Sequence, residues 1–442
     1  MKLNIDRNGV EKVVRPNNGD ARCTYLYSLL ESQKPATDRP YVGKFDVIDL
    51  DLHGTAAPLM DAAIEGVNNR GLLCITCTDA SVFASTGHPE NTFVLYGGLP
   101  LKGPLSHEGG LRLILNGIAA SAAKYGLVIE PLLSLSIDFY ARIFVRIHKS
   151  QAEVKFASGN TMLVYNCDAG CGAWTIQPLA QVKQRPDEKG YHFSLAQAPV
   201  STPNCEHCGF ETHLGGPMWA GPLHNPYFIQ KILDMLPAMD RETYQTIDRV
   251  EGLLTTALEE DLDKKTTPQQ LSAIIPRANP ALQDRHPFFF NLNAIAQVLH
   301  TQPIPCSMFR DTLGRIGYQS THSHTNPNSI RTEAPWNIVW DVMREWVRQK
   351  CPIKAGALRA GSAGAAIMRR SRDDNSPLSL LQRDIGEALK DGQDLRDLTT
   401  RIEAALYRSS SRVPTSNSSN EGPEVDETRK DALNIVFDEA LG

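Results

Sequence analysis

One segment limits the possible folds more than any other: an apolar run, a helical pattern and a second apolar run in immediate succession. Phe45–Asp51 is a short apolar run that ends in acids, as a buried parallel strand does. Residues 55–70 then carry apolar side chains at helical spacing, and Gly71 closes the pattern. Residues 72–77 form the second strand-like run. Strand, helix and strand in this order predict two parallel strands joined by a right-handed crossover.

Composition and periodicity divide the 442 residues into four regions. Residues 1–150 form the α/β region, and residues 151–215 carry short polar strands, turns and two cysteine pairs. Residues 216–355 are mainly helical, and residues 356–442 form a low-complexity, partly helical tail. The predicted fold class is therefore α/β, with an inserted cysteine segment and a mainly helical (α+β) C-terminal domain.

The C-terminal half has its own helical signals. Apolar side chains recur on one face of residues 336–350, which predicts a helix. A short helix is expected at 305–313, and the polar residues 319–332 between these two helices are expected to form a loop. A weakly amphipathic helix is expected at 378–406, followed by a disordered Ser/Pro/Glu-rich segment at 407–428.

Bulk composition excludes several classes of protein. With 41% hydrophobic and 21% charged residues, the chain has enough apolar side chains for sizeable cores, which excludes wholesale disorder. It has no run of about eighteen apolar residues, so no membrane-spanning helix is predicted. The net charge of -5 excludes a globally basic nucleic-acid binder but leaves room for a local basic face. Nine cysteines in so long a chain are typical of core thiols and metal ligands.

The most specific chemical signal is a set of four cysteines in two pairs. Cys167 and Cys171 form one pair, Cys205 and Cys208 form the other, and each pair lies in a turn rich in Gly or Asp. Two such turns can fold together so that four thiolates surround one Zn²⁺ ion. Four protein ligands leave no open position, so such a zinc ion would be structural. The alternative is four unrelated thiols.

Other candidate residues have two interpretations each. Asp51 follows a strand at the place where open α/β sheets bind ligands, but an acidic strand-to-helix turn explains it equally well. Lys102 lies in a Gly-rich loop, where it either contacts a phosphate or is solvated. His324 and Arg331 lie in the expected polar loop 319–332 and are candidate RNA contacts. Cys74 and Cys77 are expected to be core thiols, because they lie inside an apolar strand.

A series of motifs occurs in order between about residue 5 and residue 350. They are Arg15-Pro16-Asn17-Asn18-Gly19-Asp20-Ala21, Asp49-Leu50-Asp51, Thr55-Ala56-Ala57-Pro58, Cys77-Thr78-Asp79, Tyr96-Gly97-Gly98, His107-Glu108, Pro131-Leu132-Leu133-Ser134-Leu135-Ser136-Ile137-Asp138-Phe139-Tyr140, Leu214-Gly215-Gly216-Pro217-Met218-Trp219 and Thr332-Glu333-Ala334-Pro335-Trp336. With these motifs the chain resembles the tRNA (guanine-26, N2)-dimethyltransferase family, whose enzymes use S-adenosylmethionine.

The resemblance implies a fold and a set of partners. It implies a Rossmann-like class I methyltransferase domain, a zinc-bearing insertion and a C-terminal tRNA-binding domain. The implied cofactors are S-adenosylmethionine as co-substrate and a structural Zn²⁺ ion. The implied partner is tRNA, with no DNA or membrane partner expected, and the implied location is the nucleus or the mitochondrion.

The resemblance also implies residue roles. Asp20 and Ala21 match the positions that contact the adenine of S-adenosylmethionine, and Asp51 matches the acid of the family's Asp-Pro-Phe/Tyr-Gly motif. The exocyclic amine of guanine is a poor nucleophile because its lone pair is delocalised into the ring. A carboxylate that accepts its hydrogens localises the lone pair and can take the proton as the methyl group transfers. The base must leave its stack to reach such a site.

Two departures from the family pattern lead to further expectations. Leu52 replaces the motif's proline, and His53 replaces the aromatic residue that stacks on the base. Only nineteen residues precede Asp20, without the family's Gly-rich turn, so an N-terminally truncated domain of doubtful activity is expected, with Phe45–Asp51 as a bare sheet edge. Two alternatives follow: a catalytically inactive tRNA-binding zinc protein, or a zinc-stabilised interaction protein with no RNA role.

Overall fold

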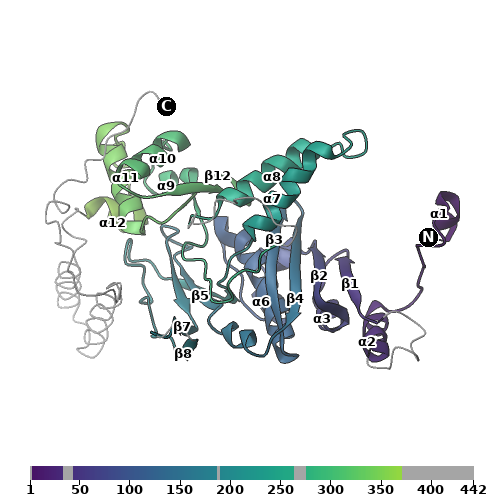
Figure 1. The fold of residues 1–442 in the computed structure, drawn as a ribbon. Helices are drawn as coiled ribbons and strands as arrows, with labels where there is room; N and C mark the ends of the chain where they lie inside the picture. Colours follow the sequence, from purple (N-terminus) through teal and green to yellow (C-terminus); the bar gives the residue numbers. More distant parts are fainter. Residues whose placement is uncertain (1, 33–42, 187–189, 263–274, 371–442) are drawn as a thin grey trace.

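A computed structural model describes residues 2–32, 43–186, 190–262 and 275–370 of the chain (Figure 1). The helices are α1 Lys2–Asn8, α2 Ala21–Ser32, α3 Met60–Gly66, α4 Ala80–Phe83, α5 Pro89–Tyr96, α6 Ser106–Lys124, α7 Pro226–Met235, α8 Ile247–Glu259, α9 Leu292–Val298, α10 Cys306–Arg315, α11 Trp336–Gln349 and α12 Ala363–Arg369. The strands are β1 Phe45–Asp51, β2 Val67–Cys77, β3 Leu127–Ile137, β4 Tyr140–Lys149, β5 Thr161–Asn166, β6 Trp174–Pro178, β7 Ala180–Gln184, β8 Tyr191–Leu195, β9 His213–Trp219, β10 Phe290–Asn291, β11 Ser320–Ser323 and β12 Asn326–Thr332.

The central element is a four-stranded sheet in the order β1-β2-β4-β3. Strands β1 and β2 are parallel, which confirms the predicted strand-helix-strand unit. Strand β4 is antiparallel to both β2 and β3, so the sheet is mixed. Because β3 therefore runs in the same direction as β1 and β2, the carboxyl ends of these three strands lie at one edge of the sheet. The expectation that β1 forms an edge strand is met within this sheet.

The connection between β1 and β2 is shorter than expected. Helix α3 ends at Gly66, and the residues that follow, which were expected to be helical up to residue 70, begin β2 instead. The pairing of Val67 with Phe45 starts the parallel ladder there, and the Asn68 side chain bonds the Lys44 carbonyl and the Asp46 carboxylate. These tertiary bonds outweigh the local helical spacing.

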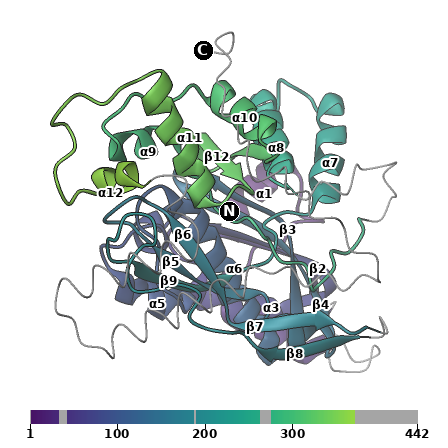
Figure 2. The same cartoon turned by 90° about the vertical axis from the view of Figure 1, so that its left-hand side faces the viewer.

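Two large apolar clusters divide the molecule. The first lies between the central sheet and helices α3 and α6, and it also includes Met162 and Val164 from the cysteine-bearing region. The second contains the four paired cysteines together with α9, α10, α11 and α12. Figures 1 and 2 show these four helices together at one end of the molecule, beyond the central sheet. The region 151–215 therefore packs against both parts of the chain.

Most C-terminal elements follow the sequence prediction, and one does not. Helices α10 and α11 confirm the helices expected at 305–313 and 336–350. The prediction of a loop at 319–332 is wrong, because these residues form the antiparallel hairpin β11–β12. The hairpin pairs with β10 in a sheet of order β10-β12-β11. Thr321 and Ser323 are buried in this hairpin although they are polar, and Ser323 Oγ lies 3.0 Å from Thr325 Oγ1 within the hairpin itself. The expected helix 378–406 and the segment 407–428 lie outside the described residues. No helix in the described ranges has the length and apolar character needed to span a membrane.

Candidate active site and metal centre

Two acids project from the same face of β1 at the carboxyl end of the strand. Ile48 and Leu50 are buried on one face of β1, and Asp49 and Asp51 are exposed on the other. This alternation confirms that the two acids share a face. Asp51 is paired in register with Thr76, which in turn is paired with Arg142 of β4.

Arg142 makes the two acids chemically different. Its Nη1 and Nη2 atoms donate to the two Asp49 oxygens at 2.7 Å and 2.8 Å, and Nη1 also donates to Thr76 Oγ1 at 2.7 Å. Among the described residues, the Asp51 carboxylate takes part in no hydrogen bond or ion pair, and it is exposed. The sheet edge therefore presents one neutralised carboxylate and one that is available to a ligand. The alternation of 139–145 indicated a strand but not the role of Arg142.

The loop after Asp51 is held to the neighbouring loop after β2. Gly54 N donates to Thr78 Oγ1 at 2.6 Å, and Thr78 N donates to the Gly54 carbonyl at 2.9 Å. The buried Tyr96 hydroxyl bonds Thr55 Oγ1 at 2.8 Å and the Asp79 carboxylate at 2.8 Å and 3.0 Å. Burial raises the pKa of Asp79 above its ordinary value. These bonds fix the backbone that carries the exposed His53. The sequence contains the motifs with Asp79 and Tyr96, but it does not indicate that these two residues are in contact.

Asp20 and Ala21 lie at the start of α2, which packs on α3 beside β1. The Asp20 carboxylate accepts hydrogen bonds from Arg22, which hold its pKa below the ordinary value. Tyr25, one turn further along α2, contacts the Phe45 ring at the start of β1. No hydrogen bond or ion pair of the described residues joins Asp20 to Asp51.

The four cysteines come together as expected. Cys167 Sγ lies 3.4 Å from Cys208 Sγ, and Cys171 Sγ lies 3.6 Å from Cys205 Sγ. All four sulfurs lie within 4.8 Å of one another and all four residues are buried. Sulfurs bound tetrahedrally at 2.3 Å from a zinc ion would be about 3.8 Å apart, so the set fits one ion. A Cβ at Gly170 would lie 2.6 Å from Cys167 Sγ, which explains why a glycine occupies that turn.

Cys74 and Cys77 are buried in the central sheet, which confirms the prediction of core thiols. Burial raises the pKa of both thiols to about 11. Both thiols are therefore protonated near neutral pH, as expected of core thiols.

The structure contradicts two of the three predicted RNA contacts. The Arg331 side chain is buried between Glu108 and Asp284, and the His324 side chain is fully buried against Glu260. In the described part of the chain the His324 side chain has no exposed surface and the Arg331 side chain is only 5% exposed, because the β11–β12 turn and β12 point them into the molecule. Lys102 does lie on the surface, with its Nζ 3.7 Å from Asp168 Oδ2.

Arg331 belongs to a buried ion cluster that the sequence did not reveal. Glu108 Oε1 accepts from Arg112 Nε at 3.0 Å and from Phe288 N at 2.9 Å, and Arg112 Nη2 donates to Asp284 at 2.6 Å. Two arginines and two carboxylates balance one another, which is the condition for burying charge. The cluster connects α6 to β12 and to the segment before β10. The i,i+4 spacing of Glu108 and Arg112 was the only signal of it in the sequence.

His224, Glu260 and His324 form a second buried group with metal-ligand side chains. His224 Nδ1 accepts from the Ser134 backbone N at 3.3 Å, and His324 Nε2 accepts from the Ser136 backbone N at 3.2 Å. Each imidazole therefore carries its proton on the nitrogen that faces Glu260. A metal ion would need lone pairs on those same nitrogens, so this group is a hydrogen-bonded clamp on a carboxylate rather than a metal centre.

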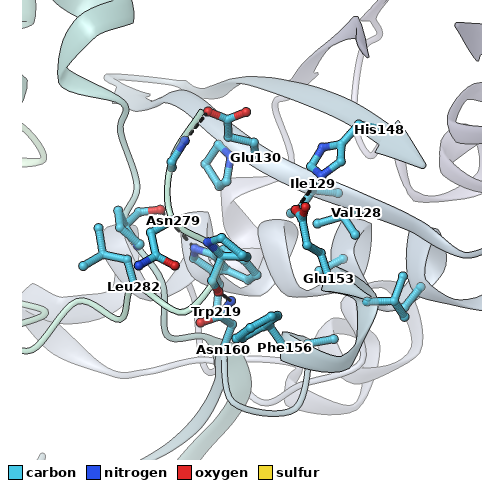
Figure 3. A pocket seen from close by; sticks show the side chains of 18 of the residues that line it. Val128, Ile129, Glu130, His148, Glu153, Phe156, Asn160, Trp219, Asn279 and Leu282 are labelled. Atoms are coloured by element: carbon cyan, nitrogen blue, oxygen red, sulfur yellow. Dashed lines mark hydrogen bonds and ion pairs between the residues drawn. The ribbon is translucent and has the colours of Figure 1, made fainter. Parts of the chain in front are cut away.

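A partly open cavity of about 60 Å³ lies at the opposite edge of the sheet (Figure 3). It is lined by apolar side chains that include Phe156 and Trp219, with His148 and Glu153 on one side. His148 Nε2 and Glu153 Oε2 are 2.8 Å apart, and Arg277 also bonds this pair. The cavity borders the beginning of β3 and the end of β4, so it is separate from the edge that carries Asp51.

Fold and site together define a mixed α/β protein with a ligand-accessible acid at the carboxyl end of a parallel strand and a separate four-thiol cluster. Residues 1–284 and 263–344 match the family model described as N2,N2-dimethylguanosine tRNA methyltransferase. The chain belongs to this family.

Curated relatives carry the same kind of name. The chain is 40% identical to the tRNA (guanine(26)-N(2))-dimethyltransferase of Schizosaccharomyces pombe, over 84% of this chain and 61% of that protein. It is 40% identical to the mitochondrial enzyme of Saccharomyces cerevisiae, over 79% of this chain and 56% of that protein. It is 33% identical to the human enzyme, over 83% of this chain and 50% of that protein. The chain thus spans about half to three fifths of the length of these relatives.

One solved structure has a similar fold. It is described as the complex structure of Trm1 from Pyrococcus horikoshii with S-adenosyl-L-methionine. The TM-score is 0.51 at 23% sequence identity, and the alignment covers 67% of this chain and 65% of that chain. This likeness supports the mixed α/β fold.

Proposed function

We propose that the chain takes part in S-adenosylmethionine-dependent methylation of the exocyclic N2 amine of guanine 26 in tRNA. The single observation that carries the proposal is the exposed Asp51 carboxylate at the carboxyl end of β1, which bonds none of the described residues, in a chain of this family. Its neighbour Asp49 is neutralised by Arg142, so of these two acids Asp51 is the one available to accept hydrogens from an amine.

The chemistry assigned to Asp51 follows from its position. A carboxylate at hydrogen-bond distance from the guanine amine would localise the nitrogen lone pair and take a proton. His53 is exposed two residues later, where its imidazole ring would stack on an unstacked base. S-adenosylmethionine supplies an electrophilic methyl group when bound. Asp20 and Ala21 are the residues proposed to contact its adenine. Ordered loops that hold donor and acceptor in line supply the rest of the rate enhancement.

We further propose that Cys167, Cys171, Cys205 and Cys208 bind one structural Zn²⁺ ion. The short Sγ–Sγ distances and the glycine at 170 support this assignment. With four protein ligands the ion has no free position, so its contribution is to folding. The finer architecture proposed is a Rossmann-like methyltransferase region at 1–150, a zinc-binding segment at 151–215, a tRNA-binding region at 216–355 and a tail at 356–442.

The proposed partner is tRNA, and we propose that the surface residue Lys102 contacts it. The mitochondrial relative and the family as a whole support a nuclear or mitochondrial location for the chain. A fluorescent fusion of the full chain that accumulates elsewhere would contradict that location.

Single-turnover methylation by the full chain tests the proposed function. Labelled methyl groups from S-adenosylmethionine are expected in a tRNA transcript with guanine at position 26 and not in the matched transcript with adenine there. Equal labelling of both transcripts would contradict the assignment of the base. Retention of tRNA with a steep salt dependence but without labelling would instead favour the non-catalytic alternative, to which Leu52 and His53 point.

A further inference from the structure

A second acid follows the strand next to β1. Strand β2 ends at Cys77, and Asp79 comes two residues later, at the edge of the sheet where β1 ends with Asp51 (Figure 1). Asp51 is paired in register with Thr76, so only two residues lie between Asp79 and the register partner of Asp51. Because β1 and β2 are parallel neighbours about 4.8 Å apart, the two acids belong to adjacent parts of one sheet edge.

Hydrogen bonds hold the loops after β1 and β2 against each other. Gly54 and Thr78 exchange two bonds, one from Gly54 N to Thr78 Oγ1 and one from Thr78 N to the Gly54 carbonyl. Asp79 directly follows this contact. The Tyr96 hydroxyl bonds both the Asp79 carboxylate and Thr55 Oγ1, each at 2.8 Å. The Asp79 carboxylate is therefore fixed beside the loop that follows β1.

The bonds to Asp79 orient its carboxylate without compensating its charge. The Tyr96 hydroxyl donates to the two carboxylate oxygens at 2.8 Å and 3.0 Å, so the Thr55 hydroxyl donates to Tyr96 in turn. Among the described residues, Asp79 forms no ion pair. Burial raises the pKa of Asp79, because its charge is partly removed from water. A partly buried carboxylate with spare lone pairs is a strong hydrogen-bond acceptor.

The usual structural role of an aspartate at this position does not explain Asp79. It is the residue before helix α4, where an aspartate side chain normally accepts hydrogen bonds from the first helical N–H groups. The Asp79 side chain makes no such bond. It is turned to the buried Tyr96 hydroxyl instead. The carboxylate is therefore held at the sheet edge by a contact that helix formation does not require.

Guanine carries hydrogens that match two neighbouring acceptors. Its N1–H and its exocyclic N2 amine lie side by side on one edge of the base. If the amine faces Asp51, a carboxylate on the adjacent loop can accept the N1–H. Adenine has a lone pair at N1, which would face the carboxylate unpaired. A site built to accept a hydrogen from its substrate rejects an analogue without that hydrogen.

We propose that Asp79 is a specificity-determining residue of the base site: held by Tyr96, its carboxylate accepts the N1–H of the guanine whose N2 amine is presented to Asp51. This inference rests on the proposed methylation of guanine 26 and deepens it, because it names the group that distinguishes guanine from other purines.

A changed residue and a changed base together test the inference. The base 2-aminopurine keeps the amine at C2 but has no hydrogen at N1. In Asp79→Asn the side-chain oxygen can still accept from Tyr96, and the amide can donate to a bare N1. In single-turnover methyl transfer, the unchanged full chain should prefer a tRNA transcript with guanine at position 26 over one with 2-aminopurine. Asp79→Asn should shift this ratio of rates about ten- to hundredfold toward 2-aminopurine.

The ratio separates base recognition from a structural role. A loop that is only damaged by Asp79→Asn slows both transcripts by the same factor and leaves the ratio unchanged. The matched control is Asp46→Asn at the other end of β1, where the carboxylate accepts from Asn68; it should keep the ratio of the unchanged chain. If Asp79→Asn does not fold, Asp79→Ser takes its place, since serine can cap α4 and its hydroxyl can donate to a bare N1.

The outcomes distinguish this inference from the proposed function. If the unchanged chain methylates the guanine transcript and Asp79→Asn keeps its ratio, Asp79 does not contact N1 and the proposed function stands. Equal rates of the unchanged chain on both transcripts would overturn the inference in the same way. If the unchanged chain does not methylate the guanine transcript, the proposed function fails and this inference fails with it.

Discussion

At the scale of single residues, position decides which side chains are chemically available. Asp49 and Asp51 are two residues apart on one strand face, yet only Asp49 is bound by Arg142. Arg331 and His324 looked like accessible cations in the sequence, but the fold turns both inward. The spacing of residues in the sequence predicts which of them lie on the same face of a strand. Their hydrogen-bond and ion-pair partners depend on strands that are distant in the sequence.

Gly98 illustrates a residue whose importance comes from close packing. A Cβ there would lie 2.3 Å from the Pro217 carbonyl oxygen, because Leu99 and Gly216 pair through two backbone hydrogen bonds. We expect Gly98→Ala to lower the free energy of unfolding by about 1–3 kcal/mol, through overpacking. Urea unfolding monitored by circular dichroism measures this.

The control for that variant is Gly117→Ala in the interior of α6. A Cβ at Gly117 would lie 3.6 Å from the nearest atom, the Tyr96 carbonyl oxygen, which is an ordinary contact. It should stabilise the protein by about 0.5–1 kcal/mol, because alanine favours the helix. Equal unfolding free energies for the two variants would contradict the packing described for Gly98.

At the scale of elements, apolar runs were predictable and polar strands were not. The strand β1 and the helices α10 and α11 could be predicted from the sequence, and each buries one mainly apolar face. The hairpin β11–β12 has no such signal, because its buried Thr321 and Ser323 are polar. Ser323 Oγ has Thr325 Oγ1 as a hydrogen-bond partner within the hairpin. The helix α3 is shorter than predicted because pairing with β1 draws Val67 into a strand.

The four-cysteine cluster is the element with the clearest predicted behaviour. We expect one Zn²⁺ ion per chain by elemental analysis, and Cys205→Ser should lose it. Because the four thiols replace an apolar core in that segment, loss of the ion should lower the unfolding free energy by more than about 4 kcal/mol. The exposed Cys23 is the control, since Cys23→Ser should keep the metal and the stability. Full metal content in Cys205→Ser would rule out this ligand set.

At the scale of the whole molecule, buried polar clusters join the C-terminal region to the central sheet. The Glu108–Arg112–Asp284–Arg331 cluster connects α6 to β12, and the Glu260 clamp connects α8, β3 and the β11–β12 turn. The sequence contains every member of these clusters but no pattern that unites them, because the partners are up to 223 residues apart. The relative placement of the two regions was therefore not predictable from spacing.

The clamp gives the molecule a pH-dependent stability. Burial holds the pKa of His224 below its ordinary value, although Glu260 opposes the shift. In the unfolded chain this histidine takes up a proton as the pH falls below about 6.5, whereas in the folded chain it stays neutral to a lower pH. The free energy of unfolding should therefore decrease as the pH falls below about 6.5. His224→Gln, which can still donate to Glu260, should flatten the decrease, whereas His88→Gln at an exposed site should not. Denaturant unfolding between pH 7.5 and 5.5 measures this, and the same slope in all three proteins would exclude His224 as its source.

The central claim is that Asp51 acts on the nucleophilic amine, and its direct test is single-turnover methyl transfer by Asp51→Asn in the full chain. We expect the rate to fall about 10²- to 10⁴-fold, as for loss of a general base, with the Kd for tRNA unchanged. Asp49→Asn, which removes the carboxylate already bound by Arg142, should lower the rate far less. A rate for Asp51→Asn within twofold of the unchanged chain would contradict the account.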